Sequence, residues 1–457
     1  MPIRFNSLST RILLILGIAV FLPPTVLAQK EQFALGADIS WIPEFEADGV
    51  KYAHNGQVRD ILDILGEHKF NYIRLRLFVD PTAEVPEDVA AGEKGEWRAS
   101  PYSKDGYCGL ESTIAMAKRV KAANMKFLLD FHYSDTWADP GKQYKPVSWR
   151  ELTFSQLTEK VRSYTKESLE AFKENGVLPD MVQVGNEAVG GMIHPDGSTN
   201  NWNNFAALVN AGIKGVKDVD PDIKIMMHTI SERNPNNWLT TLKTRLNQIE
   251  TDAAGKIDVV GLSYYPQHHG DLNSLWRILT AISNTHDIKI AVVEYADKHR
   301  EVNDLVFALP ESKRFGTFVW EPEEFDGDNS LPLFDWNFRN NRRETNSRIA
   351  LYPVMAEDYG INGGPANTIN KNVTSRAVSG AGFSVSGRGV IVYNSNVPAT
   401  VTIYNMNGRV IGRMSVSSPG IYKAERILQT PLRSGVCIIA IEPSNGRKLT
   451  FKSRIVK

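Results

Sequence analysis

The chain has 457 residues, which allows one large domain of roughly 300 residues and a second, smaller one. Its 52 basic residues balance its 52 acidic residues, so nucleic acid and anionic membrane surfaces are not expected partners. The two cysteines, Cys108 and Cys437, fall in separate predicted domains, so the core rather than a disulfide must stabilise the fold.

The N-terminus has the features of a secretory signal peptide. Arg4 and Arg11 supply positive charge, residues 12–22 (ILLILGIAVFL) form an apolar stretch, and residues 26–28 (VLA) end it with a small residue. The apolar stretch is too short to span a bilayer. We therefore expect residues 1–28 to be removed and the protein to be secreted, extracellular or at the cell surface, without stable membrane insertion. A retained N-terminal anchor is the alternative.

From residue 33 onward, short apolar runs alternate with stretches that have helical spacing. The eight strand-like runs are 33–39, 70–78, 125–133, 181–187, 222–229, 257–265, 287–294 and 316–321. The amphipathic stretches are 57–67, 110–122, 154–174, 204–219, 238–249 and 272–284. This repeat predicts an α/β fold, a (β/α)8 TIM barrel, over residues 29–359. A doubly wound sheet also alternates, but no glycine-rich phosphate turn follows the first run.

The pattern changes after residue 359. Residues 360–380 are rich in Gly, Asn, Ser and Thr, which predicts a linker. Residues 381–457 contain short β-type runs separated by turn signals such as Asn407-Gly408. They predict a small all-β domain, a β-sandwich, and they contain no cluster of acidic residues, His or Cys that could perform chemistry.

Nearly every strand-like run ends in a polar or aromatic side chain. These residues are Asp38, Arg74, Arg76, His132, Asn186, Glu187, His228, Tyr264, Tyr265, Glu294 and Trp320. Because the carboxyl ends of barrel strands form the active-site mouth, we expect these side chains to meet there. Trp137, in the loop after the third run, is expected to join them, although it could instead pack as a lid.

Glu187 and Glu294 end the fourth and seventh runs. Facing each other across a barrel mouth, they would supply the two catalytic carboxyl groups of a glycosidase. Retaining enzymes hold the two groups about 5–5.5 Å apart and inverting enzymes about 6.5–9.5 Å, a gap that no sequence measures. Each glutamate could instead be a structural carboxylate beside an arginine. Arg74 is the candidate partner, and it could hold Glu294 ionised.

His132 and His228 raise the question of a metal. Neither belongs to a His-Glu-x-x-His motif, so hydrogen bonding to sugar hydroxyls or to the catalytic pair is the preferred interpretation. No metal or cofactor is predicted. The acidic loop 323–329 could bind calcium, but a solvated loop is preferred. Tyr264, Tyr265 and Trp320 are predicted to stack against sugar rings.

Several motifs resemble one enzyme family. They are GADIS at 36–40, IRLR at 73–76, DFHYSDTWADP at 130–140, VGNE at 184–187, GLSYYP at 261–266 and VVE at 292–294. They are similar to the endo-β-1,4-galactanases of glycoside hydrolase family 53. The resemblance implies a TIM barrel that hydrolyses galactan and type I arabinogalactan with retention, with Glu187 as acid/base and Glu294 as nucleophile. It implies a substrate lining of Asp38, Arg74, His132, Asn186, His228, Tyr264 and Trp320.

The sequence departs from that family after Glu294, where Tyr295-Ala296-Asp297-Lys298 replaces the usual Trp-Pro pair and a long loop. One wall of the cleft is therefore expected to be shorter, which leaves the subsites and the calcium question open. Another barrel β-glycanase, such as a β-mannanase or a β-glucanase, is the alternative function. A non-catalytic glycan-binding protein is a further alternative from a different class.

The C-terminal segment has a resemblance of its own. ATVTIYNMNGRVIG at 399–412, the turn at 431–436 and the Lys-rich end at 448–457 resemble the sorting domain of the type IX secretion system in Bacteroidetes. The resemblance implies that secretion machinery is a partner. A carbohydrate-binding module is the rival interpretation, although the segment has few aromatic residues for an exposed strip.

Overall fold

The computed structural model describes most of the chain from residue 32 onward. The described ranges are 32–84, 101–323, 331–337, 342–361, 383–385, 390–393, 398–405, 410–417, 420–423, 427, 435–444 and 449–455. The predicted signal peptide and most of the predicted linker therefore lie outside the described residues.

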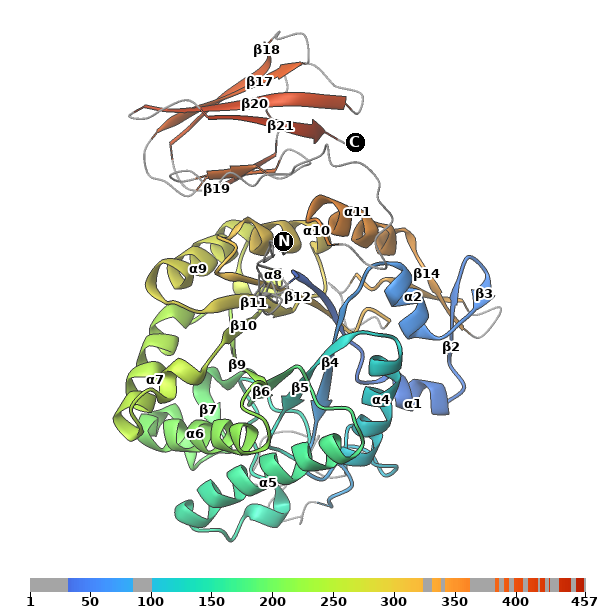
Figure 1. Cartoon of the computed structure of the whole chain (residues 1–457), viewed down its shortest axis with the longest axis vertical. Coiled ribbons are helices and arrows are strands. Elements are labelled where there is room, and N and C mark those ends of the chain that lie inside the picture. The colour runs from blue at the N-terminus through green and yellow to red at the C-terminus, as the bar shows by residue number, and fades with distance from the viewer. Residues whose placement is uncertain are drawn as a thin grey trace, which may run out of the picture. The chain divides into compact units, whose positions relative to one another are not determined.

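Eight parallel strands form a closed barrel (Figure 1). In barrel order they are β1 (Ala34–Asp38), β12 (Arg314–Trp320), β11 (Lys289–Glu294), β10 (Val259–Ser263), β9 (Lys224–Ile230), β6 (Met181–Val184), β5 (Lys126–Phe131) and β4 (Tyr72–Leu77). Each predicted run coincides with one of these strands. The predicted TIM barrel is confirmed.

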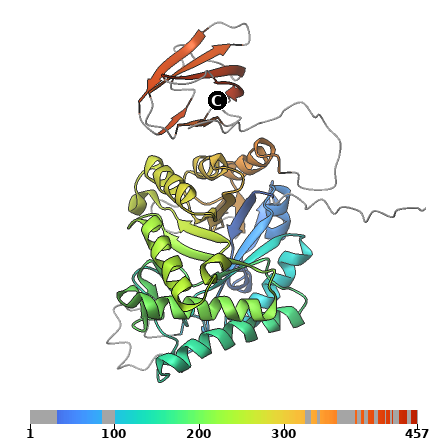
Figure 2. The same cartoon turned by 60° about the vertical axis from the view of Figure 1, so that its left-hand side comes forward.

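Helices surround the barrel on its outer side (Figures 1 and 2). They are α4 (Leu110–Ala122), α5 (Phe154–Glu174), α6 (Trp202–Val219), α7 (Pro235–Ile249), α9 (Leu272–Thr285) and α10 (His299–Ala308). Short elements between them are η2 (Val147–Trp149), η3 (Ala188–Gly190), β7 (Gly191–Met192), β8 (Gly197–Ser198), η4 (Thr199–Asn201), η5 (Ala253–Lys256) and α8 (Pro266–His269). The apolar stripes of the helices pack on outward-facing strand side chains such as Leu75, Leu129 and Val182.

The predicted helix at 57–67 is only partly correct. Helix α2 (Ile61–Glu67) begins after Asp60, whose carboxylate caps it by accepting the N–H of Leu62. The sequence did not predict a small sheet in the order β13 (Phe334–Asn337), β14 (Arg342–Thr345), β2 (Lys51–His54) and β3 (Gln57–Val58). It also did not predict α1 (Ile42–Ala47), η6 (Ser347–Ala350) and α11 (Leu351–Asp358).

The interior of the barrel is divided into an apolar and a polar part. The apolar cluster consists of Ala34, Tyr72, Leu128, Met181, Met226, Val259, Ala291, Val293, Phe315 and Phe318. Nearer the carboxyl ends, the inward positions carry Asp38, Arg74, Asp130, Gln183, His228 and Ser263, all buried. A polar layer at this end of the strands is where barrel enzymes place their chemistry.

The C-terminal part contains two antiparallel sheets. One has β15 (Phe383–Val385), β16 (Val390–Tyr393) and β19 (Gly420–Lys423), and the other has β18 (Val410–Val416), β17 (Ala399–Asn405), β20 (Gly435–Pro443) and β21 (Leu449–Ile455). Val401 and Ile403 are buried opposite Ile441 and Ile439. The all-β character is confirmed, and the sandwich and the domain bounds stay predictions. No helix in the described residues combines the length and apolarity needed to cross a bilayer.

Gly36 on β1 is a test of the interior packing. A Cβ added there would lie 2.3 Å from Cδ1 of Phe318. We expect Gly36→Ala to lower the free energy of unfolding by about 1–3 kcal/mol, because a packed interior cannot make room for a methyl group. Gly141→Ala is the control, since its Cβ would meet its nearest neighbour at 3.4 Å. Urea titrations that show equal effects for both variants would contradict this account.

Candidate active site

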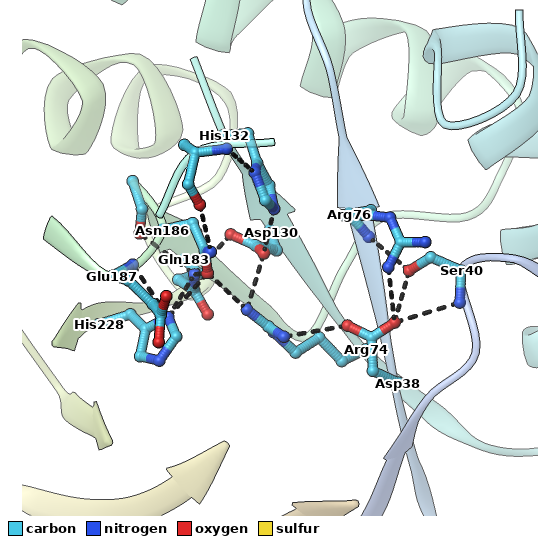
Figure 3. A network of polar contacts seen from close by, with 12 residues as sticks. Asp38, Ser40, Arg74, Arg76, Asp130, His132, Gln183, Asn186, Glu187 and His228 are labelled. Atoms are coloured by element: carbon cyan, nitrogen blue, oxygen red, sulfur yellow. Dashed lines mark hydrogen bonds and ion pairs between the residues drawn. The ribbon is translucent and has the colours of Figure 1, made fainter. Parts of the chain in front are cut away.

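Arg74 on β4 connects several of the candidate residues and is fully buried. Its Nη1 lies 3.0 Å from Oδ2 of Asp38 and 2.8 Å from Oε1 of Glu294. Its Nη2 donates to Oδ2 of Asp130 and to Oδ1 of Asn186, both at 2.8 Å. Figure 3 shows the guanidinium between Asp38 and Asp130. Because a buried cation needs such partners, these residues form one electrostatic unit.

Asp130 on β5 is the second centre of this network (Figure 3). It accepts hydrogen bonds from Nε2 of Gln183 and, at 3.1 Å, from Nε2 of His132. The Nδ1 atom of His132 accepts the N–H of Ala138, so the proton that faces Asp130 is on Nε2. Burial alone would raise the pKa of Asp130, but Arg74 and His132 hold that pKa below its usual value. His132 therefore supports the network and the loop after β5.

Glu187 and Glu294 lie next to each other at the mouth, although β9 and β10 separate their strands. One carboxylate oxygen of each glutamate and one ring nitrogen of His228 all lie within 4.8 Å of one another. The exposed fractions of Glu187 and Glu294 are 9% and 5%. Two carboxyl groups this close and this buried are not both ionised at neutral pH.

Two backbone irregularities aim the glutamates into the mouth. Val293 is an extra residue in β11, because the register passes from Leu262–Val292 directly to Ser263–Glu294. Val293 already faces the interior, so without this bulge the alternation of the strand would turn Glu294 outward. Glu187 follows β6 with a φ of 42°, a left-handed conformation that is costly for non-glycine residues and is concentrated at functional sites.

The surroundings give the two glutamates different protonation behaviour. Burial and the charge of Glu294 raise the pKa of Glu187 well above its usual value, and a hydrogen bond with Ser263 opposes this. Burial raises the pKa of Glu294 to about 7, and Arg74 opposes this rise most strongly. Since Arg74 contacts Glu294 directly, Glu294 is the carboxylate of the pair and Glu187 holds the proton.

His228 lies beside Glu187 in Figure 3, and one of its ring nitrogens lies within 4.8 Å of a carboxylate oxygen of Glu294. Its Nδ1 accepts the N–H of Glu187 at 3.2 Å, and its Nε2 lies 2.9 Å from Oγ of Ser263. Ser263 in turn donates to Oε2 of Glu294 at 3.2 Å. Burial and Arg74 lower the pKa of His228 well below its usual value, so the ring is neutral.

Glu187, His228 and Glu294 are also the three side chains that could together hold a metal ion among the described residues. A metal would have to displace the bonds that both ring nitrogens of His228 already make, and it would lie beside the cation of Arg74. The donor set therefore fits hydrogen bonding to the carboxyl pair better than metal ligation.

The two predicted tyrosines have different positions. The hydroxyl of Tyr265 lies 3.4 Å from Oε2 of Glu294, and the side chain is partly exposed at the mouth. Tyr264 is 1% exposed, belongs to the core outside the barrel and donates to the carbonyl of Gly270. The prediction that Tyr264 contacts a substrate is wrong. Ser263 faces inward, so strand alternation turns the next residue outward.

Three tryptophans surround Arg76, two from loops after β1 and β5 and one from the end of β12. The Cζ atom of Arg76 lies 4.2 Å from the ring centroid of Trp137, 5.1 Å from Trp41 and 5.6 Å from Trp320. All three tryptophans are partly exposed. Trp137 and Trp320 were predicted at the mouth, and the structure brings them together there with Trp41, which was not predicted.

Several further residues of the network were missed from the sequence: Asp130, Gln183, Ser263 and Trp41. A signal for Asp130 and Gln183 was present. Each is a polar residue inside an otherwise apolar run, two positions after an inward-facing Leu128 or Met181. Trp41 follows the first strand in a loop, where aromatic residues are more often functional.

The predicted solvated acidic loop needs one correction. Its first residue, Glu323, is fully buried and therefore does not belong to a solvated loop. Residues 324–329, the remainder of the possible calcium loop, lie outside the described residues.

A parallel barrel with two adjacent carboxyl groups at the carboxyl ends of its strands has the layout of a glycosidase. Comparison with known proteins agrees, because the model of glycosyl hydrolase family 53 matches residues 34–304. The chain belongs to this family, and it is a glycosidase.

The chain is also similar to individual proteins. An uncharacterized protein of Niallia circulans is 40% identical over 278 residues, which are 59% of this chain and 68% of the relative. The endo-β-1,4-galactanase of Bacillus subtilis strain 168 is 34% identical over 266 residues, 58% of this chain and 57% of the enzyme. The family 53 catalytic domain of Ignisphaera aggregans is 29% identical with a TM-score of 0.60, covering 74% of this chain and 99% of that domain.

Proposed function

We propose that this glycosidase hydrolyses β-1,4-galactosidic bonds in galactan and type I arabinogalactan with retention of configuration. The observation that carries the mechanism is the spacing of Glu187 and Glu294, whose nearest carboxylate oxygens lie within 4.8 Å. This spacing fits the gap of about 5–5.5 Å in retaining enzymes and is shorter than the gap of about 6.5–9.5 Å in inverting enzymes.

The reaction has two steps. The carboxylate of Glu294 attacks the anomeric carbon while Glu187 gives its proton to the leaving glycosidic oxygen, and a covalent glycosyl-enzyme results. Glu187, now ionised, takes a proton from water, and that water breaks the ester bond to Glu294. The two carboxyl groups and one water are sufficient for this chemistry.

The same contacts explain how Glu187 can serve first as acid and then as base. The negative charge of Glu294 raises the pKa of Glu187 in the free enzyme. Formation of the ester removes that charge, so the pKa of Glu187 falls when the residue is needed as a base. Arg74 favours the ionised form of Glu294 before the attack and again after the ester is released.

The substrate is supported by family membership and by named relatives such as the Bacillus subtilis endo-β-1,4-galactanase. Secretion is supported by the signal features of residues 1–28.

The C-terminal β-strands at 399–455 are compatible with the proposed sorting domain of type IX secretion. Expression with and without residues 381–457, followed by fractionation, tests that assignment, and unchanged export of the truncated chain would contradict it.

Variants of the two glutamates test the roles. On galactan, Glu187→Gln is expected to lower kcat/KM by about 10²–10⁴-fold, and Glu294→Gln is expected to abolish turnover. On an aryl galactoside whose phenolate needs no protonation to leave, Glu187→Gln should retain formation of the glycosyl-enzyme, whereas Glu294→Gln should lose it. The measurement is stopped-flow release of the phenolate.

A panel of polysaccharides tests the substrate. The wild-type enzyme is expected to release oligosaccharides from β-1,4-galactan and none from β-mannan or cellulose. Hydrolysis of mannan or cellulose without galactan would replace the proposal with another barrel β-glycanase. Binding without hydrolysis of any glycan would favour the non-catalytic alternative.

The hydroxyl of Ser263 gives a prediction about pH. Its single proton is donated to Oε2 of Glu294, which favours the ionised form of that carboxyl group. We expect Ser263→Ala to raise the pKa of Glu294, moving the acid limb of the kcat/KM profile upward by about one pH unit. Ser231→Ala is the control, because its buried hydroxyl makes no hydrogen bond among the described residues. An acid limb that stays in place or moves downward would rule out this role.

A further inference from the structure

Glu321 and Glu323 form a second pair of buried carboxyl groups, just after β12. Both side chains are fully buried, and their carboxyl groups lie close enough for each to change the pKa of the other. Oε2 of Glu321 and both carboxylate oxygens of Glu323 receive no N–H or O–H donor from the described part of the chain. Glu321 has a φ of 38°, so the backbone holds it in a costly left-handed conformation.

The other oxygen of Glu321 binds Arg76. The Nη1 atom of Arg76 lies 2.5 Å from Oε1 of Glu321 and 3.7 Å from Oδ1 of Asp38. Asp38 already binds Arg74, so Glu321 supplies the nearer anion for Arg76. Figure 3 shows Arg76 beside Asp38 and Ser40 at the edge of the catalytic network.

Arg76 in turn supports the aromatic side of the mouth. Its guanidinium packs on the faces of Trp137, Trp41 and Trp320. Trp41 meets Trp137 edge-on, with ring centroids 5.9 Å apart, and Trp137 lies at the same distance from Trp320. A cation fixed in place orients all three rings at once, because each is attracted to it through its π face.

Two facing carboxyl groups without a donor between them require a proton. Arg76 favours the ionised form of Glu321, so the proton belongs on Glu323. Burial and the neighbouring Glu321 both raise the pKa of Glu323 well above its usual value, which agrees with this placement. A proton on Glu323 also supplies the O–H donor that the contact with Glu321 lacks.

We propose that Glu321 and Glu323 share one proton and act as a positioning pair, holding Arg76 and, through it, the three tryptophans that face the sugar. The role of the three tryptophans toward the sugar rests on the proposed function. The shared proton of Glu321 and Glu323 does not. With one proton the pair presents a single negative charge to Arg76. A second charge would be repelled inside this buried site.

The charged and titratable groups around the pair come from several elements. Arg76 and Asp38 face Glu321, while Arg343 on β14 donates to the backbone carbonyl of Glu323. Tyr52 on β2 also lies near Glu323, and burial raises the pKa of its hydroxyl. Neither carboxylate oxygen of Glu323 has a hydrogen-bond donor among the described residues, so Arg343 does not replace the shared proton.

The proton is tested by urea unfolding of the full chain at several pH values, compared with Glu323→Gln. The sign follows from linkage. Folded Glu323 keeps a proton that the unfolded chain loses above about pH 4.3, so rising pH should favour unfolding of the wild type. For each pH unit, the unfolding equilibrium constant of the wild type is expected to rise by a factor that is about ten times the factor for Glu323→Gln. Glu170→Gln, a partly exposed glutamate on α5, should keep the wild-type slope.

The positioning role is tested by kinetics. Glu321→Gln removes the anion from Arg76, so KM is expected to rise about tenfold while kcat changes little. If that variant does not fold, Arg76→Lys, which keeps the charge but loses the planar stacking, is expected to give the same split. The unfolding measurement needs no substrate, so it tests the shared proton of Glu321 and Glu323 even if galactan is not cleaved.

Three outcomes would overturn the proposal. Equal pH slopes for wild type and Glu323→Gln would mean that Glu323 holds no proton in the folded state. A rise in Tm with calcium that a chelator reverses, and that Glu323→Gln abolishes, would mean that a cation takes the place of the proton. A loss of kcat without a change in KM would mean that the pair does not position the aromatic side of the mouth.

Discussion

The structure of this site depends on the buried charge of Arg74. Its guanidinium is the common partner of Asp38, Asp130 and Glu294, all of which would otherwise be carboxylates in a closed interior. Breaking such a buried pair by removing one partner leaves uncompensated charge at a cost of about 3–5 kcal/mol. The arrangement of the polar layer therefore follows from the need to surround one cation with anions and amide oxygens.

This constraint also creates the difference between the two glutamates. Arg74 contacts Glu294 directly. It also donates a hydrogen bond to Asn186, the residue immediately before Glu187. One carboxyl group therefore faces a cation, and the other faces the resulting anion. When the surroundings shift the pKa values of two neighbouring carboxyl groups apart, a single site acquires both a nucleophile and an acid. The neutral ring of His228 adds hydrogen bonds without adding a competing charge.

A similar arrangement recurs around Arg76 on the same strand. Arg74 and Arg76 are two residues apart, so both side chains point into the mouth. Arg74 contacts the nucleophile of the reacting pair, whereas Arg76 is surrounded by tryptophans and a proton-sharing carboxyl pair. One strand thus links the chemistry to the surface on which a sugar would stack.

Much of the fold could be predicted because barrel strands are apolar and regularly spaced. The eight runs stand out from the helices, and α4 and α5 have the predicted bounds. The site could be predicted in outline, since polar strand ends in a barrel share one mouth. Tyr264 was misassigned because being at the end of a strand does not determine which face a side chain occupies.

Other parts could not be predicted from local patterns. The bulge at Val293 depends on pairing with β10, and strand alternation alone would have turned Glu294 outward. Glu323 is buried near Arg343 and Tyr52, which are far apart in sequence. An acidic residue followed by more acidic residues is typical of a solvated loop, and tertiary contacts override that pattern here.

The stereochemistry of the first product tests the central claim most directly. Proton NMR of galactan oligosaccharides during the first minutes of hydrolysis distinguishes the two anomers before mutarotation mixes them. The close spacing of Glu187 and Glu294 predicts that the β-anomer appears first and the α-anomer follows slowly. Initial release of the α-anomer would contradict the account, because inversion requires a water between two carboxyl groups held farther apart.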